Sequence, residues 1–219
     1  MDRLKSFVKR NNFLYTFACH VYSLLLPFLY QVVGVKVKNH GRGKIRKFIR
    51  GKNNEIVIGD GSQMDNVLFR IVGNNNRIVF GDNCKVRKNS SFWMEGSNIE
   101  IKIGDNCTFN HTNHFCAQED NTKIILGDNC MFSNNIIIRT SDSHKVLDIN
   151  TGERLNHPGN VLIGNHVWVA AQVIILKDVE IGDDSIIATK ALVSKNVPAG
   201  CIAGGVPAKV IKTGVSWLA

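Results

Sequence analysis

The sequence has little proline, few tryptophans and no paired cysteine motif. It contains four prolines, three tryptophans and six cysteines in 219 residues. None of the cysteines has the CxxC-type spacing of a zinc site, and no small-residue cleavage site of an export signal follows the apolar N-terminal stretch. We therefore expect neither disulfides nor a structural metal. We expect a reducing, cytoplasmic setting.

Acidic residues are nearly absent from the first quarter of the chain. Residues 1–52 hold 12 Lys or Arg and one acid, Asp2, for a net +11, whereas residues 53–219 hold 15 basic and 17 acidic groups, for −2. Nucleic acid could explain such an excess, but the segment lacks a zinc-ligand pattern and a recognisable helix-turn-helix. We therefore expect no nucleic-acid partner.

The stretch over residues 13–35 is strongly apolar and has basic residues on both sides. His20, Pro27 and Gln31 interrupt it, and the flanking charges give a single span no orientation. Three interpretations stay open: a helical element on an anionic membrane surface, a helical cap on the β-structure or another subunit, and a true span. We treat residues 1–52 as a separate basic and apolar segment containing a helix.

The later part of the sequence repeats with a period of six. The six positions of this repeat are β-branched aliphatics: Ile163, Val169, Ile175, Ile181, Ile187 and Val193. This period is neither the 3.6 residues of a helix nor the alternation of an ordinary strand, and it is typical of a parallel β-helix. We expect an all-β fold, with the β-helix over residues 53–198, beginning near Ile56, and a C-terminal cap over residues 199–219.

A Gly-Asp-Asn-Cys motif occurs three times and ends at Cys84, Cys107 and Cys130. Asparagine tolerates the left-handed backbone conformation and so suits the tight corners of a β-helix. Other coils have serine or valine in the cysteine position, which indicates a small inward residue. We therefore expect these three cysteines to stack as a buried column of small hydrophobic residues.

One polar segment, residues 139–160, leaves the six-residue repeat and contains Gly and Pro. Long loops in compact repeat folds are usually functional. The segment carries Asp142 and His144, and histidine is a natural general base because its unperturbed pKa is near ~6.5. An exposed histidine without a role is the alternative. Asp142 could orient the imidazole or bind a substrate, and a backbone carbonyl could orient the ring equally well.

Four motifs of the C-terminal part resemble those of the hexapeptide-repeat acyltransferases. They comprise residues 141–144, 163–169, 188–198 and 204–209. The resemblance is greatest to the branch with capsule polysaccharide O-acetyltransferases and maltose and galactoside acetyltransferases. It implies a left-handed parallel β-helix, a homotrimer with active sites between subunits, and acetyl-CoA as the acyl donor, with no metal.

The same resemblance assigns roles to individual residues. It implies that His144 is the catalytic base, with Asp142 and Trp168 as further catalytic residues and Trp168 beside the acceptor. The implied coenzyme contacts are Ala171, Thr189, Ser194, Lys195, Lys209 and Lys212. Related enzymes carry arginine at the last two positions, so this chain keeps the charge and loses bidentate phosphate contact. We expect His114 to line the acceptor groove.

We therefore expect an O-acetyltransferase that acts on a sugar hydroxyl in capsule, O-antigen or exopolysaccharide assembly. It would be cytoplasmic or peripheral on the inner face of the cell membrane. One alternative is an acetyltransferase for a small acceptor, such as a nucleotide sugar (by N-acetylation), a xenobiotic or serine. A zinc-dependent β-helix of the carbonic anhydrase type and a purely structural β-helix are others, and His111 and His114 keep the zinc alternative open. His157 and His166 have no assigned role.

Overall fold

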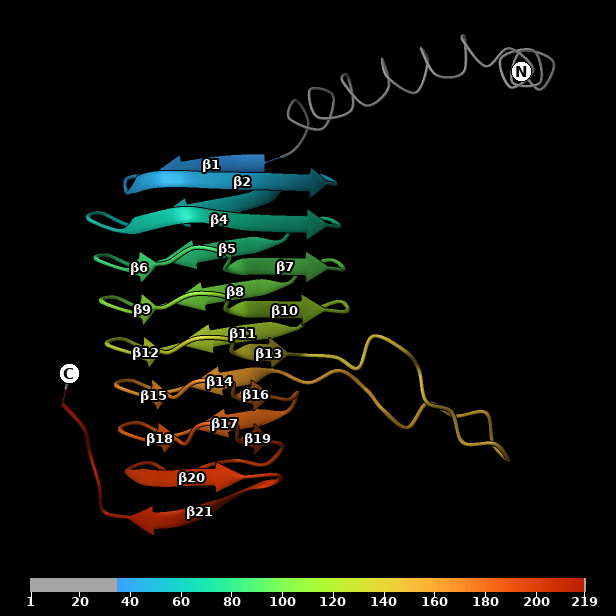
Figure 1. Cartoon of the computed structure of the whole chain (residues 1–219). Helices are drawn as coiled ribbons and strands as arrows, with labels where there is room; N and C mark the ends of the chain where they lie inside the picture. Colours follow the sequence, from blue (N-terminus) through green and yellow to red (C-terminus); the bar gives the residue numbers. More distant parts are fainter. Residues whose placement is uncertain (1–34, 219) are drawn as a thin grey trace, which may run out of the picture. The chain divides into compact units, whose positions relative to one another are not determined.

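The computed structural model describes residues 35–218, and β-strands are the only regular secondary structure in this part of the chain (Figure 1). The apolar helix expected within residues 13–35 falls, apart from Val35, outside the described residues. Among the described residues, no helix is present that could cross a bilayer. The all-β prediction is therefore confirmed for this part of the chain.

The strands stack into a solenoid with three faces. Face 1 is a seven-stranded parallel sheet made of β1 (Val35–Asn39), β3 (Asn54–Ile58), β5 (Arg77–Phe80), β8 (Glu100–Ile103), β11 (Lys123–Leu126), β14 (Val161–Ile163) and β17 (Val179–Ile181). Face 2 contains β6 (Lys85–Val86), β9 (Thr108–Phe109), β12 (Met131–Phe132), β15 (Trp168–Val169), β18 (Ile186–Ile187) and β20 (Cys201–Gly205). Face 3 contains β7 (Ser91–Glu95), β10 (His114–Gln118), β13 (Ile137–Arg139), β16 (Ile174–Ile175) and β19 (Leu192–Val193).

Two long strands join faces 2 and 3. Strand β4 (Gln63–Val72) pairs with β6 through its first residues and with β7 through its later ones. Strand β2 (Arg42–Arg50) lies parallel to β4 along its whole length. The expected parallel coils are thus present, and the repeat of six reflects one strand and one corner.

The inward residues of successive coils pack directly on one another. Along face 1, Ile163 is paired with Ile181, and along face 3, Ile138 is paired with Ile175 and Ile175 with Val193. Higher coils place phenylalanine in the core. The ring of Phe92 stacks on those of Phe69 and Phe115 at centroid distances of 5.7 and 4.7 Å. This continuous apolar column holds the solenoid together, since each coil contacts only its neighbours.

The Gly-Asp-Asn-Cys corners have the geometry expected of them. Asn83, Asn106 and Asn129 all adopt positive φ angles of 57 to 59°. The Sγ atoms of the cysteines that follow point inward, and that of Cys107 donates to the carbonyl of Gly127 at 3.2 Å. The three cysteines form the predicted buried column. The glycines are required because a Cβ at Gly104 would lie 2.2 Å from Asp128 Oδ1 of the next coil.

The solenoid begins earlier than the boundary at residue 52 that the charge pattern favoured. Strand β1 already pairs with β3 in parallel, and β2 pairs with β4. The basic side chains of β2 face solvent, while Ile45 and Ile49 turn toward the core. The charge pattern did not indicate this first coil, because a coil needs only a few inward apolar residues and its exposed side chains can all be basic.

The C-terminal end closes the solenoid. Strand β20 continues face 2 in parallel with β18, and β21 (Ala208–Thr213) then returns antiparallel to β20. The last described residues lie against face 2, where Trp217 stacks on His166 at 4.3 Å and donates from Nε1 to the His166 carbonyl at 2.8 Å. The expected cap over residues 199–219 therefore contains one further parallel strand.

Candidate active site

The loop that carries His144 projects from the corner between faces 3 and 1. It leaves after Arg139, the end of β13, and returns at Val161, the start of β14 (Figure 1). Within the loop, Leu147 and Arg154 form an antiparallel bridge that makes its two arms run together. The polar residues predicted to break the repeat thus form a narrow hairpin-like arm.

An ion pair fixes the loop to the solenoid at its base. Arg154 donates to Glu119, at the end of β10, from Nη1 to Oε2 at 2.5 Å and from Nη2 to Oε1 at 2.7 Å. The Ser141 hydroxyl donates to the same carboxylate. The Arg154 hydrogen bonds, aided by Ser141, lower the pKa of Glu119 to about 2. The carboxylate is therefore charged at any physiological pH and holds both arms of the loop.

A second contact set surrounds the backbone of His144. Asn156 donates from Nδ2 to Asp142 Oδ2 at 2.8 Å and to the His144 carbonyl oxygen at 2.7 Å. The ammonium of Lys177, which follows β16, also donates to Asp142 and lowers the pKa of this carboxylate below its ordinary value. Asp142 therefore acts on the loop backbone through Asn156, and its carboxylate is occupied by contacts other than the imidazole.

The imidazole of His144 is exposed and forms no hydrogen bond to any described residue. A ring held by its backbone and free at both nitrogens can accept a proton from a bound hydroxyl. His157 lies in the same loop and is also exposed, but within residues 35–218 no hydrogen bond holds its backbone, whereas the His144 carbonyl accepts one from Asn156. The geometry therefore distinguishes two histidines that burial alone does not.

Trp168 lies on β15 of face 2, on a different face from the corner at which the loop leaves. A single chain does not bring Trp168 and His144 together. The indole Nε1 of Trp168 is buried and has no hydrogen-bond partner within residues 35–218. A buried donor without a partner costs roughly 1–3 kcal/mol, and the indole Nε1 of Trp93, on face 3, is in the same situation.

His114 lies on face 3, in β10. Its Nδ1 is 2.7 Å from the Ser91 hydroxyl of the coil above, and burial lowers its pKa. The imidazole is therefore neutral at pH 7 and partly covered. Among residues 35–218, no three His, Cys, Asp or Glu side chains are grouped as ligands for a metal ion.

The predicted coenzyme residues lie on the last coils in three groups. Because Val169 pairs with Ile187, Ala171 and Thr189 follow at the same corner between faces 2 and 3. Ser194 and Lys195 follow β19 at the corner between faces 3 and 1, the corner from which the His144 loop leaves two coils earlier. Lys209 and Lys212 project from β21 and are exposed. The two corners flank face 3, and β21 lies below.

Sequence patterns did not indicate Glu119, Arg154, Asn156 or Lys177. These residues are far apart in the chain: 35 positions separate Glu119 from Arg154, and 35 separate Asp142 from Lys177. One weak signal was available, because Glu119 occupies a corner position with φ of +70°, where each coil above has glycine (Gly96, Gly73 and Gly51). An acidic residue at such a corner indicates a role beyond the turn itself.

Residues 160–195 match the family model described as bacterial transferase hexapeptide (six repeats). Among curated proteins, the chain is 34% identical over 85 residues to the polysialic acid O-acetyltransferase of Escherichia coli O1:K1 / APEC. That alignment covers 39% of this chain and 28% of the relative. The chain is also 41% identical over 61 residues to the galactoside O-acetyltransferase of Escherichia coli K12, covering 28% and 29% of the two chains.

A solved structure resembles a larger part of the chain. It is the crystal structure of the polySia specific acetyltransferase NeuO, with a TM-score of 0.61 and 26% identity. The match covers 85% of this chain and 83% of the other. The predicted fold and the resemblance to hexapeptide-repeat acyltransferases are thus confirmed, while the curated relatives are matched over less than a third of their own length.

Proposed function

We propose that this chain, which carries a hexapeptide-repeat domain and is homologous to polysialic acid and galactoside O-acetyltransferases, transfers an acetyl group from acetyl-CoA to a sugar hydroxyl. The acceptor is a sugar of a capsule, O-antigen or exopolysaccharide. The observation that carries the proposal is the position of His144, which is exposed on a loop that two contacts tie to the solenoid, Arg154 with Glu119 and Asp142 with Lys177. A structural β-helix has no need of such a clamp.

In this mechanism His144 acts as the general base. Its neutral imidazole accepts the proton of the sugar hydroxyl as the oxygen attacks the thioester carbonyl, and the imidazolium then protonates the departing thiolate of coenzyme A. Asp142 and Asn156 are positioning residues, because they hold the His144 backbone and not its ring. Trp168 is proposed to lie beside the acceptor, where its partly exposed ring would contact the sugar.

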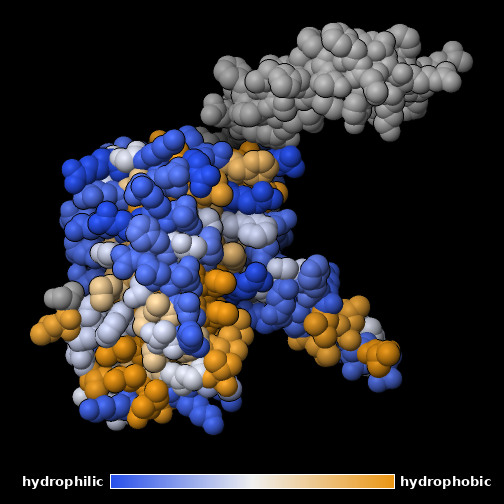
Figure 2. Space-filling view, viewed as in Figure 1, coloured by the Kyte–Doolittle hydropathy of each residue, from blue (hydrophilic) through white to orange (hydrophobic). Residues whose placement is uncertain are grey.

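The separation of His144 from Trp168 supports a site completed by a second subunit, and we propose a homotrimer. The loop exposes apolar side chains at its outer part, with Val146, Leu147 and Leu155 54, 54 and 61% exposed and Ile149 95% exposed. Figure 2 shows this hydrophobic end of the loop and further hydrophobic side chains over the later coils. Contact with a neighbouring subunit would bury both. Mass measurement by light scattering tests the trimer.

For the coenzyme, the corner backbone at Ala171 and Thr189 is suited to hold the pantetheine arm. Ser194 and Lys195 lie at the next corner, and the ammonium groups of Lys209 and Lys212 are suited to meet phosphates as point charges. This arrangement leaves face 3 between the two corners for the reacting groups. His114 opens onto the same face and is proposed to contact the acceptor.

For localisation, we propose a cytoplasmic enzyme that is peripheral on the inner face of the cell membrane. The apolar stretch over residues 13–35 and the basic residues around it support this proposal. Deletion of residues 1–34 is expected to release the protein from anionic liposomes. Unchanged binding of the truncated protein would contradict a membrane role for this segment.

The test of function is an acceptor screen with acetyl-CoA. Release of the coenzyme thiol is measured with polysialic acid, other capsular polymers, nucleotide sugars, chloramphenicol and serine, and NMR of the product locates the acetyl group. We expect release with a polysaccharide or lipid-linked sugar and an O-acetyl ester in the product. Turnover with a small acceptor alone would favour the alternative acetyltransferases, and no coenzyme binding would contradict the proposal.

A further inference from the structure

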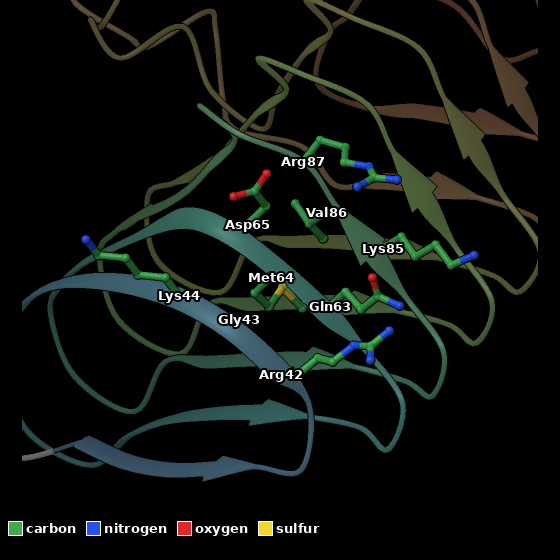
Figure 3. A pocket seen from close by; sticks show the side chains of 9 residues that line it. All are labelled: Arg42, Gly43, Lys44, Gln63, Met64, Asp65, Lys85, Val86 and Arg87. Carbon is green, nitrogen blue, oxygen red and sulfur yellow. The ribbon is translucent and has the colours of Figure 1, made fainter.

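A groove of about 340 Å³ lies on face 2 of the first coils, far along the solenoid from the His144 loop. It is formed by β2, β4 and β6, which are consecutive coils of that face. Figure 3 shows the polar side chains that line it: Arg42, Lys44, Gln63, Asp65, Lys85 and Arg87. No catalytic or coenzyme role proposed above falls on any of these residues.

The strand register orders these side chains into two columns. Arg42 pairs with Gln63, and Gln63 with Lys85, so one column reads Arg, Gln, Lys. Lys44 pairs with Asp65, and Arg87 follows in the next coil. Because strands lie ~4.8 Å apart and alternate residues ~7 Å apart, the Cα atoms of the four cationic residues lie at the corners of a rectangle on the order of 7 by 10 Å.

The floor of the groove lies between the columns. Met64 and Val86 are buried there, and Figure 3 shows Gln63 and Lys85 on one side of them and Asp65 on the other. Gly43 completes the floor. It has φ of +109°, and a Cβ at this position would lie 2.2 Å from the Met64 carbonyl oxygen. Only glycine fits at this position, because a side chain would clash with the backbone of β4.

The cations of the groove are not neutralised by the rest of the described chain. Arg42, Lys44, Lys85 and Arg87 form no ion pair within residues 35–218, and the one carboxylate, Asp65, leaves a net charge of +3. Cations elsewhere do pair, since Arg77 lies 3.1 Å from Glu55 and 3.6 Å from Glu100 on face 1. Four unpaired cations within one groove favour an anionic ligand.

We propose that this groove binds a carboxylated polysaccharide segment, as a second site that holds the acceptor polymer away from the catalytic loop. Carboxylates on successive sugars would meet the corner cations, which are spaced over several ångströms. The side chains of Gln63 and Asp65, between them, suit sugar hydroxyls as hydrogen-bond partners. The four cationic residues are spread over two columns and three coils, so their spacing suits a chain that carries one charge on each of several sugars better than a single phosphate headgroup.

The test is equilibrium binding of the full-length protein to labelled polymers without acetyl-CoA. The probes are polysialic acid, alginate and hyaluronan, with carboxyl-reduced polysialic acid and dextran as neutral controls. The groove variant is Arg42→Gln/Lys44→Gln/Lys85→Gln/Arg87→Gln. The charge-matched control is Lys36→Gln/Lys52→Gln/Lys102→Gln/Lys123→Gln, whose side chains are exposed and lie outside the groove. Thermal unfolding checks that both variants fold.

We expect at least one carboxylated polymer to bind, with ~10-fold or greater weakening in the groove variant and little change in the control. The neutral polymers should not bind. Equal loss in both variants, or no binding of any carboxylated polymer, would overturn the proposal. The proposal would also be overturned if the four cations bound vesicles of phosphatidylcholine and phosphatidylglycerol and did not bind the polymers.

The role of the groove in holding an acceptor rests on the proposed function, and one variant separates the two. His144→Ala should bind the polymer as tightly as the wild type, because the loop and the groove lie on different coils. If no acetyl transfer to any sugar is found while groove-dependent binding persists, the enzymatic proposal fails and the glycan site stands. If acetyl transfer is found but no polymer binds through the groove, the glycan site fails and the enzymatic proposal stands.

Discussion

Arg154 holds Glu119 through both of its terminal nitrogens, although 35 residues separate the two in the chain. Their side chains are only 16 and 28% exposed. Glu119 is the first residue after β10 on the solenoid, and Arg154 lies in the returning arm of the loop that presents His144. This pair, with Ser141 on the same carboxylate, converts a long polar insertion into an arm with a fixed base.

The Glu119 carboxylate makes the order of the loop depend on pH. Its pKa is about 2 in the folded protein against an ordinary value of 4.5, so the stabilisation is complete above about pH 4.5 and is lost as the pH falls through 2. Glu119→Gln should remove it at neutral pH. Because hydrogen bonds to charged groups contribute roughly 1.5–3 kcal/mol, we expect the loop to open at least about tenfold more often.

Hydrogen exchange of residues 140–160 measures this opening. The wild type should protect the loop equally at pH 7 and pH 5, and Glu119→Gln should lose protection there at both pH values while the core strands stay protected. Asp120→Asn, on the next and exposed residue, is the matched control. Equal protection in Glu119→Gln and wild type would show that the ion pair does not hold the loop.

Asn156 links Asp142 to the His144 backbone, and its removal should affect turnover more than binding. Asn156→Ala loses the hydrogen bonds to the Asp142 carboxylate and the His144 carbonyl. A catalytic group displaced by ~1 Å can cost about 10²-fold in rate, so we expect kcat to fall by about that factor with KM for acetyl-CoA unchanged. Asn150→Ala, in the same loop, should retain the wild-type kcat.

The cysteine column predicts which substitutions the core accepts. Cys107 donates to the Gly127 carbonyl, and Ser62 and Ser185 donate to carbonyls from the same position in other coils, each at 2.9 Å. Cys107→Ser should therefore change the free energy of unfolding by less than ~1 kcal/mol. Cys107→Leu should overpack the column and cost ~1–3 kcal/mol. Denaturant unfolding of both variants measures these changes. A serine variant as unstable as the leucine variant would contradict the proposed packing of the cysteine column.

The six-residue repeat could be predicted from the sequence because the packing and turn requirements that produce it are local. Each hexad places one aliphatic residue inward, as at Ile163 and Ile181, and the corner that follows needs a residue that tolerates positive φ. The early coil at Val35 was missed because basic residues dominate its exposed side. The loop itself was predicted from the break in the repeat between Ile138 and Val161.

The contacts that hold the site could not be predicted in the same way. The pairing of Arg154 with Glu119 depends on the path of the loop, and many paths would satisfy its polar residues equally. The same is true of Lys177 and Asp142, which meet because one coil lies below another. Trp168 was placed by its motif, but its unpartnered N–H follows only from the packing around it.

The most direct test of the account compares two histidines of one loop. His144→Ala and His157→Ala are assayed for acetyl transfer to the acceptor found in the screen, with equal thermal stability required of both. We expect His144→Ala to lose ~10²–10⁴-fold in kcat while still binding acetyl-CoA, and His157→Ala to keep wild-type activity. Wild-type turnover by His144→Ala would contradict its role as the base.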